Sequence, residues 1–423
     1  MSTFNKTVLD NGLRIITVPK TDSLATTVLV MVEAGSDYET KEINGISHFL
    51  EHMCFKGTEK RPKSIDITNE LNNIGSQYNA FTWHEYTGYY AKAQNIHTDK
   101  LLDLVSDIYL NPVFDVNEME KEKGVVVEEI NMYEDRPDRK VHDLFSALLY
   151  GDQPAGWDIA GTKETVRSVT RDALVNYRSQ HYVANATTIV VAGGLDKKEV
   201  LGKIQSYFSR VSTGEKSGRG KTGEKQEKPA LRLGYKKSDQ THLVMGVRAF
   251  NLFDERRFAL EILGEILGGG FGSRLFEKIR SEMGAAYYVG AGATLLSDRG
   301  YLAAFAGIDH AKLMPVVHAV VGECKKLAEE QVTTAELERC KNKLSGHLIL
   351  DLETSDSLAS YYGGQEILKE EIMAPEELLV KIRAVTAEQI QEVARDVFQN
   401  NKLNFAMIGP HEDEKRIGEV LYF

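Results

Sequence analysis

The sequence resembles itself at a constant offset of 216 residues, and this repeat restricts the possible folds more than any other feature. Residues 166–194 resemble residues 382–410, and both patterns predict a helix that leads into a strand. The identical pairs include Val169 and Val385, Thr170 and Thr386, Asn185 and Asn401, and Gly193 and Gly409. We therefore expect an α+β protein with two similar domains related by internal duplication. In each domain, helices would pack on a mainly antiparallel sheet. Chance similarity between two common helix–strand units is the alternative.

Residues 211–229 separate the two copies and have a different composition from the rest of the chain. They contain Gly, Lys, Ser and Glu and almost no apolar residues, which predicts a flexible linker or an exposed loop. We therefore expect an N-terminal domain over residues 1–210 and a C-terminal domain over residues 230–423. A chain of 423 residues is long enough for both domains to bury a core.

The charge and the cysteine content restrict the partners and the compartment. The chain has 51 Lys and Arg against 62 Asp and Glu, a net charge of −11, which argues against nucleic acid or an anionic membrane as a partner. Its three cysteines form no CxxC pair, so a reducing compartment is expected rather than a disulfide scaffold. No signal peptide and no long apolar run are visible, and we expect a cytoplasmic protein.

The motif His48-Phe49-Leu50-Glu51-His52 lies in a predicted helix over residues 46–53. Residues four apart share one helix face, so the two imidazoles can bind one zinc ion. Glu51 faces the same side and is better placed to hold a metal-bound water than to join the ligands. The alternative is a pair of ordinary histidines on an amphipathic helix.

A third ligand must come from another segment, and residues 117–133 are rich in acids. The Val run in this segment suits a strand or a buried helix, and the spacing of its acids favours the helix. Glu122 and Glu129 are seven residues apart and share a face, whereas Glu128 is rotated away by about 100°. One of the pair can bind zinc while the other orients a ligand. A solvated acidic face is the alternative.

The internal repeat tests whether these residues are structural or chemical. At the same offset, His48 corresponds to Gly264, His52 to Gly268 and Glu129 to Ser345. No histidine occurs between residues 243 and 309. A shared fold therefore does not require the motif, which favours a chemical role in the first copy.

The inverted HxxEH motif, with a glutamate 77 residues after its second histidine, resembles the pitrilysin/insulinase family, the inverzincins. The similarity covers nearly the whole chain and includes residues 9–19, 34–40, 45–58, 78–90, 122–138 and 267–291. The length matches the shorter members, which are related to mitochondrial processing peptidase subunits and to bacterial peptidases.

The resemblance implies a zinc-dependent metalloendopeptidase with one Zn²⁺ per chain in the N-terminal domain. His48, His52 and Glu129 would be the ligands. Glu51 would be the base that activates the zinc-bound water, and Glu122 would be a supporting acid.

The resemblance also implies how a substrate is bound. Asn79, Ala80 and Phe81 would lie on an edge strand that pairs with the peptide backbone. Arg280 and Tyr287, in the C-terminal domain, would contact the substrate and stabilise the oxyanion. The Gly-rich residues 267–273 resemble the flexible loop of the processing peptidase's non-catalytic subunit.

Longer members of the family carry two such halves in one chain, whereas this sequence carries one. The resemblance therefore implies a homodimer, or a dimer with a related chain, that encloses a chamber and admits unfolded peptides or short proteins. Arg280 and Tyr287 of one subunit would then serve the zinc site of the other. The alternatives are a non-catalytic partner or structural subunit, and a targeting-sequence processing peptidase that needs a partner chain.

Overall fold

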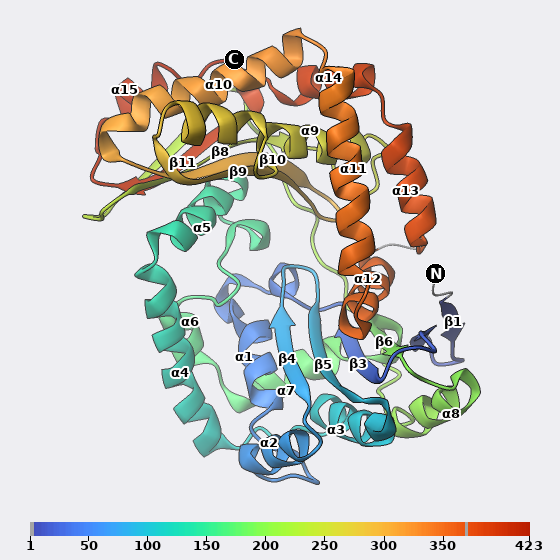
Figure 1. Ribbon diagram of the computed structural model, residues 1–423. Coiled ribbons are helices and arrows are strands. Elements are labelled where there is room, and N and C mark those ends of the chain that lie inside the picture. The colour runs from blue at the N-terminus through green and yellow to red at the C-terminus, as the bar shows by residue number, and fades with distance from the viewer. Residues whose placement is uncertain (1–3, 369–370) are drawn as a thin grey trace. The chain divides into compact units, whose positions relative to one another are not determined.

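Residues 4–368 and 371–423, which the computed structural model describes, divide into two units, and each unit is built around one sheet (Figure 1). The first unit comprises residues up to 130, residues 158–220 and residues 349–373. The second comprises residues 131–157, 221–348 and 374–423.

The sheet of the first unit has six strands in the order β1-β2-β6-β3-β5-β4, and only β2 and β6 pair in parallel. Its strands are β1 (Asn5–Val8), β2 (Arg14–Pro19), β3 (Ala25–Val32), β4 (Gln77–Thr82), β5 (Thr87–Gln94) and β6 (Thr187–Gly193). Its helices are α1 (Ile46–Cys54), α2 (Ser64–Asn73), α3 (Thr98–Leu110), α6 (Lys163–Ser168), α7 (Arg171–His181), α8 (Lys197–Tyr207), α12 (Ser355–Leu368) and most of α4 (Val116–Glu134). The short helices are η1 (Ser36–Tyr38), η2 (Lys41–Ile43), η3 (Asn95–His97) and η5 (Ala184–Ala186).

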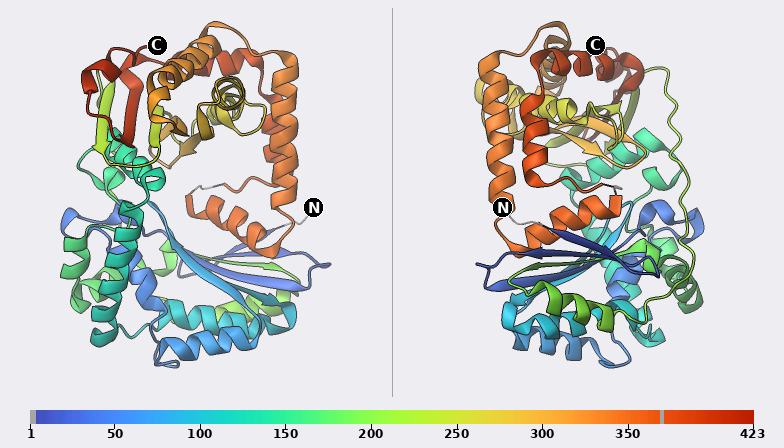
Figure 2. Two further views of the ribbon diagram at one scale, coloured as in Figure 1. Left: turned by 60° about the vertical axis from the view of Figure 1, so that its left-hand side comes forward. Right: turned by 90° about the vertical axis from the view of Figure 1, so that its right-hand side faces the viewer.

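Both faces of this sheet are apolar, because β3 turns alternate buried side chains to opposite sides. Val28 and Val30 face a core shared with α1, α3 and α7, whereas Leu29 and Met31 face α12. Figure 2 shows α12 on one face of this sheet, and α2, α3 and α8 on the opposite side.

The sheet of the second unit has five strands in the order β7-β11-β8-β10-β9, and only β7 and β11 pair in parallel. The strands are β7 (Ala230–Tyr235), β8 (Thr241–Ala249), β9 (Ala286–Leu295), β10 (Gly300–Ile308) and β11 (Leu403–Gly409). The helices are α5 (Pro137–Tyr150), α9 (Arg257–Gly268), α10 (Leu313–Glu329), most of α11 (Thr334–Asp351), α13 (Pro375–Ala384), α14 (Ala387–Val397) and α15 (Glu414–Gly418). The short helices are η4 (Pro154–Gly156), η7 (His310–Lys312), η8 (Asn400–Lys402) and the π-helical η6 (Phe276–Glu282).

The two units repeat one topology, which confirms the expected α+β fold with two similar domains. The order β7-β11-β8-β10-β9 matches β2-β6-β3-β5-β4 with the same parallel pair. Helices α7 and α14, and strands β6 and β11, begin and end 216 residues apart. The resemblance between the two copies is therefore structural and not a coincidence of sequence.

The units differ from the two sequence halves by the exchange of one helix each. Residues 1–210 include α5, but in α5 Val141 and Phe145 pack on the sheet of the second unit. Residues 230–423 include α12, but Leu358 and Tyr362 of α12 pack on the sheet of the first unit. Residues 211–229 contain no helix or strand, and they divide between the units after Gly220.

Strands β4 and β5 form a hairpin and are joined by residues 83–86. Trp83 N donates to the carbonyl oxygen of Tyr86 at 2.8 Å and closes this turn. Across residues 4–368 and 371–423, no helix is long and apolar enough to cross a membrane.

Candidate metal centre

Helix α1 holds the HxxEH motif between a buried apolar face and a polar face. Phe49, Leu50 and Met53 are fully buried in the core of the first unit. The N-terminus of α1 is fixed by Glu39, whose carboxylate accepts from Gly45 N at 2.7 Å and from Ser47 N at 2.8 Å. These backbone donors have no partner within the helix, so the buried carboxylate satisfies them. This anchoring fixes where the first histidine lies.

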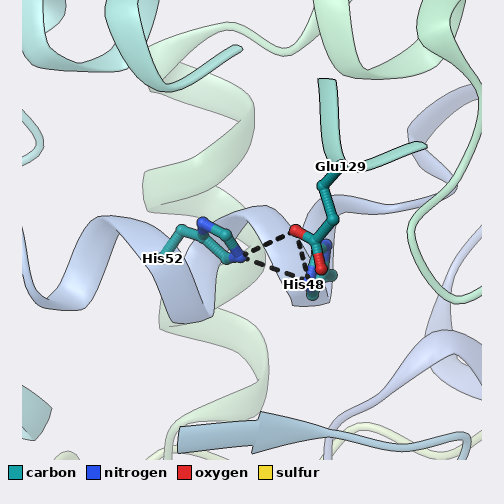
Figure 3. Close-up of side chains that lie close together, drawn as sticks. All are labelled: His48, His52 and Glu129. Carbon is teal, nitrogen blue, oxygen red and sulfur yellow. Dashed lines mark hydrogen bonds and ion pairs between the residues drawn. The ribbon is translucent and has the colours of Figure 1, made fainter. Parts of the chain in front are cut away.

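His48, His52 and Glu129 bring three metal-ligating atoms together (Figure 3). The two imidazole Nε2 atoms are 3.2 Å apart, and Glu129 Oε2 lies 3.8 Å from that of His48 and 3.6 Å from that of His52. Ligands at about 2.0–2.1 Å from a tetrahedral zinc ion are about 3.3 Å from one another. Two imidazole nitrogens and one carboxylate oxygen at these separations therefore fit zinc, with a fourth position left open. In the part of the chain that the structure describes, this is the one group of three such residues.

Glu122 orients the ring of His52. Its carboxylate is buried, and it accepts from His52 Nδ1 at 2.9 Å and from Lys56 Nζ at 2.6 Å. Because Nδ1 donates, the lone pair of His52 lies on Nε2, which faces His48 and Glu129. Burial raises the pKa of Glu122, but the hydrogen bonds from His52 and Lys56 outweigh it and the pKa is lowered. Glu122 thus acts through His52 and is not itself within the cluster.

The pKa values of the two histidines are shifted in opposite directions. Burial, and secondarily the neighbouring His52, lower the pKa of His48 to about 3, so His48 is a neutral imidazole at neutral pH. Burial lowers the pKa of His52, but the hydrogen bond to Glu122 and the nearby carboxylates outweigh it and the pKa is raised. Among the described side chains His48 Nδ1 finds no hydrogen-bond partner, so the two rings are not held in the same way.

Glu51 is held beside the cluster by a residue that the sequence pattern did not indicate. Thr82, the last residue of β4, donates from Oγ1 to Glu51 Oε2 at 2.6 Å. Burial raises the pKa of Glu51, and this hydrogen bond opposes the rise. A carboxylate with a raised pKa is suited to take up a proton and release it again. Glu128, by contrast, is exposed and takes no part in the cluster.

Asn79, Ala80 and Phe81 lie on β4, which is at the edge of the first sheet. Within the described part of the chain β4 pairs with β5 alone, so its other side is an open strand edge. Ala80 N donates to the side-chain oxygen of Asn79 at 3.0 Å. Phe81 lies over Gly88 on β5, where an added Cβ would come within 2.2 Å of the Phe81 ring.

Arg280 and Tyr287 lie together in the second unit, on η6 and β9. Arg280 Nη1 donates to the carbonyl oxygen of Tyr287 at 2.6 Å, and the guanidinium lies 5.8 Å from the Tyr287 ring. The ring of Phe276 is 5.3 Å from the same guanidinium. Tyr287 is 74% exposed, so its side chain is accessible.

At the positions that the sequence offset of 216 pairs with the candidate ligands, the second unit has packing. An added Cβ at Gly268, paired with His52 by that offset, would come within 2.3 Å of Ala291 N on β9. Ser345, which corresponds to Glu129, donates from Oγ to the carbonyl oxygen of Lys341 at 2.6 Å. The same fold is therefore built without ligands at these positions.

The sequence matches two family profiles, described as Insulinase (Peptidase family M16) over residues 14–163 and Peptidase M16 inactive domain over residues 168–344. It is also 36% identical over 401 residues to the uncharacterized zinc protease YmxG of Bacillus subtilis strain 168, which covers 95% of this chain and 97% of the relative. The chain belongs to the insulinase family, peptidase family M16. The resemblance stated from the sequence is thereby confirmed.

A further relative and two solved structures are also similar to this chain. An uncharacterized zinc protease of Rickettsia felis is 34% identical over 417 residues, covering 97% of this chain and 98% of the relative. A protease from Helicobacter pylori has the same fold, with a TM-score of 0.90 at 20% identity and coverage of 97% and 100% of the two chains. A peptidase M16 inactive domain from Pseudomonas fluorescens also has a TM-score of 0.90, at 16% identity and coverage of 97% and 99%.

Proposed function

We propose that this insulinase-family chain is a zinc-dependent metalloendopeptidase that binds one Zn²⁺ through His48, His52 and Glu129. The observation that carries the proposal is the approach of the two Nε2 atoms and the Glu129 carboxylate to within 3.8 Å, with the Glu51 carboxylate held beside them. The relatives that bear the name zinc protease support it.

Zinc bound there would supply Lewis-acid chemistry, which polarises a peptide carbonyl and makes an attacking water more acidic. Glu51 takes the proton from the attacking water and later gives it to the leaving amine. Thr82 holds Oε2 of Glu51, which leaves Oε1 to accept that proton. Glu122 keeps the ring of His52 in the tautomer that a metal requires.

We place the substrate on the open edge of β4, with Asn79, Ala80 and Phe81 as its backbone partners. The Ala80 N–H that Asn79 now accepts would instead pair with a carbonyl of an extended peptide. Pairing of this kind uses main-chain groups, so the substrates would be unfolded peptides or short proteins of varied sequence. Glu51 lies at the end of the same strand through its bond to Thr82, which brings the bound backbone to the base.

We further propose a dimer, with itself or with a related chain, in which Arg280 and Tyr287 of one subunit serve the zinc site of the other. Mixing inactive Glu51→Gln and Arg280→Ala chains tests this exchange. Random reassortment would restore about a quarter of the native activity, because half of the dimers are hybrids with one complete site each. No restoration, or a fully active monomer, would contradict the shared site.

Cleavage of a mixed pool of short peptides tests the catalytic proposal. Native protein should cut, chelation should abolish cutting, and added zinc should restore it. Glu128→Gln is the matched control for the inactive Glu51→Gln variant. It changes an exposed carboxylate beside Glu129 and should cut like the native chain. Native protein that binds zinc but cuts only with a related chain present would indicate a processing peptidase. Native protein that binds no zinc and cuts nothing would indicate a non-catalytic subunit.

A further inference from the structure

The Arg219 side chain is largely buried against two carboxylates of the first unit, although it belongs to the segment predicted as a flexible linker. Its guanidinium donates from Nη1 to Asp37 Oδ2 at 3.0 Å and from Nη2 to Glu85 Oε1 at 2.5 Å. The Arg219 side chain is only 13% exposed, and both carboxylates are nearly inaccessible. Charged groups buried to this extent need a paired partner, which Arg219 supplies.

Asp37 and Glu85 belong to two segments that pack on each other. Asp37 is in η1, and its N–H donates to the carbonyl oxygen of His84 at 2.8 Å, next to Glu85. The approach is so close that an added Cβ at Gly35 would lie 2.2 Å from the carbonyl oxygen of Trp83. Arg219 therefore bridges η1 and the turn over residues 83–86.

Each bridged segment continues directly to the candidate metal centre. Two residues beyond Asp37, Glu39 holds the N-terminus of α1 through Gly45 N and Ser47 N. Immediately before the turn, Thr82 holds the carboxylate of Glu51. Glu51 lies on α1, which η1 helps to fix, but its carboxylate is held by Thr82 beside the turn. The position of this carboxylate relative to α1 thus depends on the contact between η1 and the turn.

We infer that Arg219 is a positioning residue, which holds the turn over residues 83–86 against η1 and so keeps Thr82 in place for Glu51. The inference rests on the proposed function. Without the guanidinium, Asp37 and Glu85 each lose a bonded cation, while their two negative charges remain close together and repel each other. The turn then moves away from η1 and carries Thr82 with it.

The geometry distinguishes Arg219 from its neighbour Lys216. The guanidinium forms a fork that reaches both carboxylates at once, whereas an ammonium is a single point of charge. Lys216 pairs with Glu33, but Glu33 also accepts from Arg14 Nη2 at 2.7 Å. Removal of Lys216 leaves Glu33 paired, so Lys216→Met is a matched control in the same segment.

Four variants test the inference: Arg219→Met, Arg219→Lys, Lys216→Met and the double variant Arg219→Met with Glu85→Gln. Arg219→Met should lower kcat by about 10- to 100-fold, the scale of a small displacement of a reacting group, while KM and zinc content stay near native. The kcat of Arg219→Lys should lie between that of Arg219→Met and that of the native chain. The double variant should recover part of the lost kcat, because one of the repelling charges is gone. Lys216→Met should remain within about twofold of native.

An unchanged kcat in Arg219→Met, or an equal loss in Lys216→Met, overturns the inference. If Arg219→Met does not fold, Arg219→Lys decides, and native kcat in that variant overturns it. If the native chain cuts no peptide, the proposed function fails and hydrogen exchange of residues 82–86 gives the answer instead. Faster exchange in Arg219→Met than in Lys216→Met then supports a role in fixing the turn, and equal exchange overturns it.

Discussion

Replacing Glu122 by alanine should weaken zinc binding without touching a ligand. The Glu122 carboxylate is 5% exposed and accepts from His52 Nδ1 at 2.9 Å and from Lys56 Nζ at 2.6 Å. Without it, the Nδ1–H of His52 has no acceptor and the ring loses the contact that fixes its tautomer. The Lys56 ammonium also loses the anion that neutralises it next to the proposed cation site.

The expected loss follows from these two contacts. Removal of a group that orients a metal ligand typically costs 10- to 100-fold in affinity, or about 1.4–2.7 kcal/mol. Both hydrogen bonds are charge-assisted and largely screened from solvent, so Glu122→Ala should lie near ~100-fold. Glu122→Gln keeps an oxygen for His52 but turns an amide N–H2 toward Lys56 or loses that contact, and we expect about 10-fold.

Competition between the protein and a chromophoric zinc chelator, at fixed pH and ionic strength, measures this loss directly. Glu128→Ala is the matched control, since it removes an exposed carboxylate from the same helix. Glu122→Ala that binds zinc within about threefold of the native chain would refute the argument. An equal loss in Glu128→Ala would refute it as well, because long-range charge and not ring orientation would then explain the effect.

Three further outcomes are expected for the stability of the first unit. Arg61 is 1% exposed and paired with Asp107 at 2.6 Å. Arg61→Met should therefore lower the free energy of unfolding, measured in urea, by about 3–5 kcal/mol. A loss below about 1 kcal/mol would contradict this. Gly35→Ala should lower the free energy of unfolding by roughly 1–3 kcal/mol in the same assay. Its Cβ would lie 2.2 Å from the carbonyl oxygen of Trp83. Native stability would show that the turn over residues 83–86 can shift freely. Burial lowers the pKa of His181 from 6.5 to about 4. The unfolded chain therefore binds a proton between these values that the folded chain does not, and stability falls as the pH falls from 6.5 to 4. Allowing for screening by solvent, the loss is about 2 kcal/mol; His181→Phe should lose that much less on acidification, and an unchanged acid dependence would contradict the assignment.

The local part of the site could be predicted from sequence because helix periodicity is local. The spacing of His48 and His52 is enough to place both rings on one face of α1, and the same argument separates Glu129 from Glu128 on α4. The internal repeat likewise predicted the doubled α+β fold, since α7 and β6 recur as α14 and β11 at one offset. Residue spacing within a helix and an internal repeat can both be read without knowing which segments are in contact in the fold.

The groups that support the site could not be found in this way, because each comes from a distant segment without a pattern of its own. Thr82 ends an edge strand whose turn over residues 83–86 contains no Gly, Pro or Asn to mark it. Arg219 lies in a polar, Gly-rich segment whose composition predicts mobility, and only the buried Asp37 and Glu85 give it a fixed place. The sequence of an amphipathic helix also does not determine which sheet the helix covers.

The exchange of α5 and α12 between the two units illustrates this limit. Phe145 gives α5 one of the apolar side chains by which it packs on a sheet, and Tyr362 does the same for α12. Periodicity predicts that each helix needs a sheet to cover, but not which of the two similar sheets receives it. A division at residues 211–229 therefore assigns both helices to the wrong sheet, although it separates most other elements.

Zinc content and peptide cleavage, measured together in Glu51→Gln and His48→Ala, test the proposed zinc site most directly. We expect Glu51→Gln to keep about one zinc per chain and to cut nothing, whereas His48→Ala should lose both zinc and cleavage. Separation of binding from catalysis in this way would assign the ligand and the base to different residues. Native cleavage by Glu51→Gln, or a full complement of zinc in His48→Ala, would contradict the account.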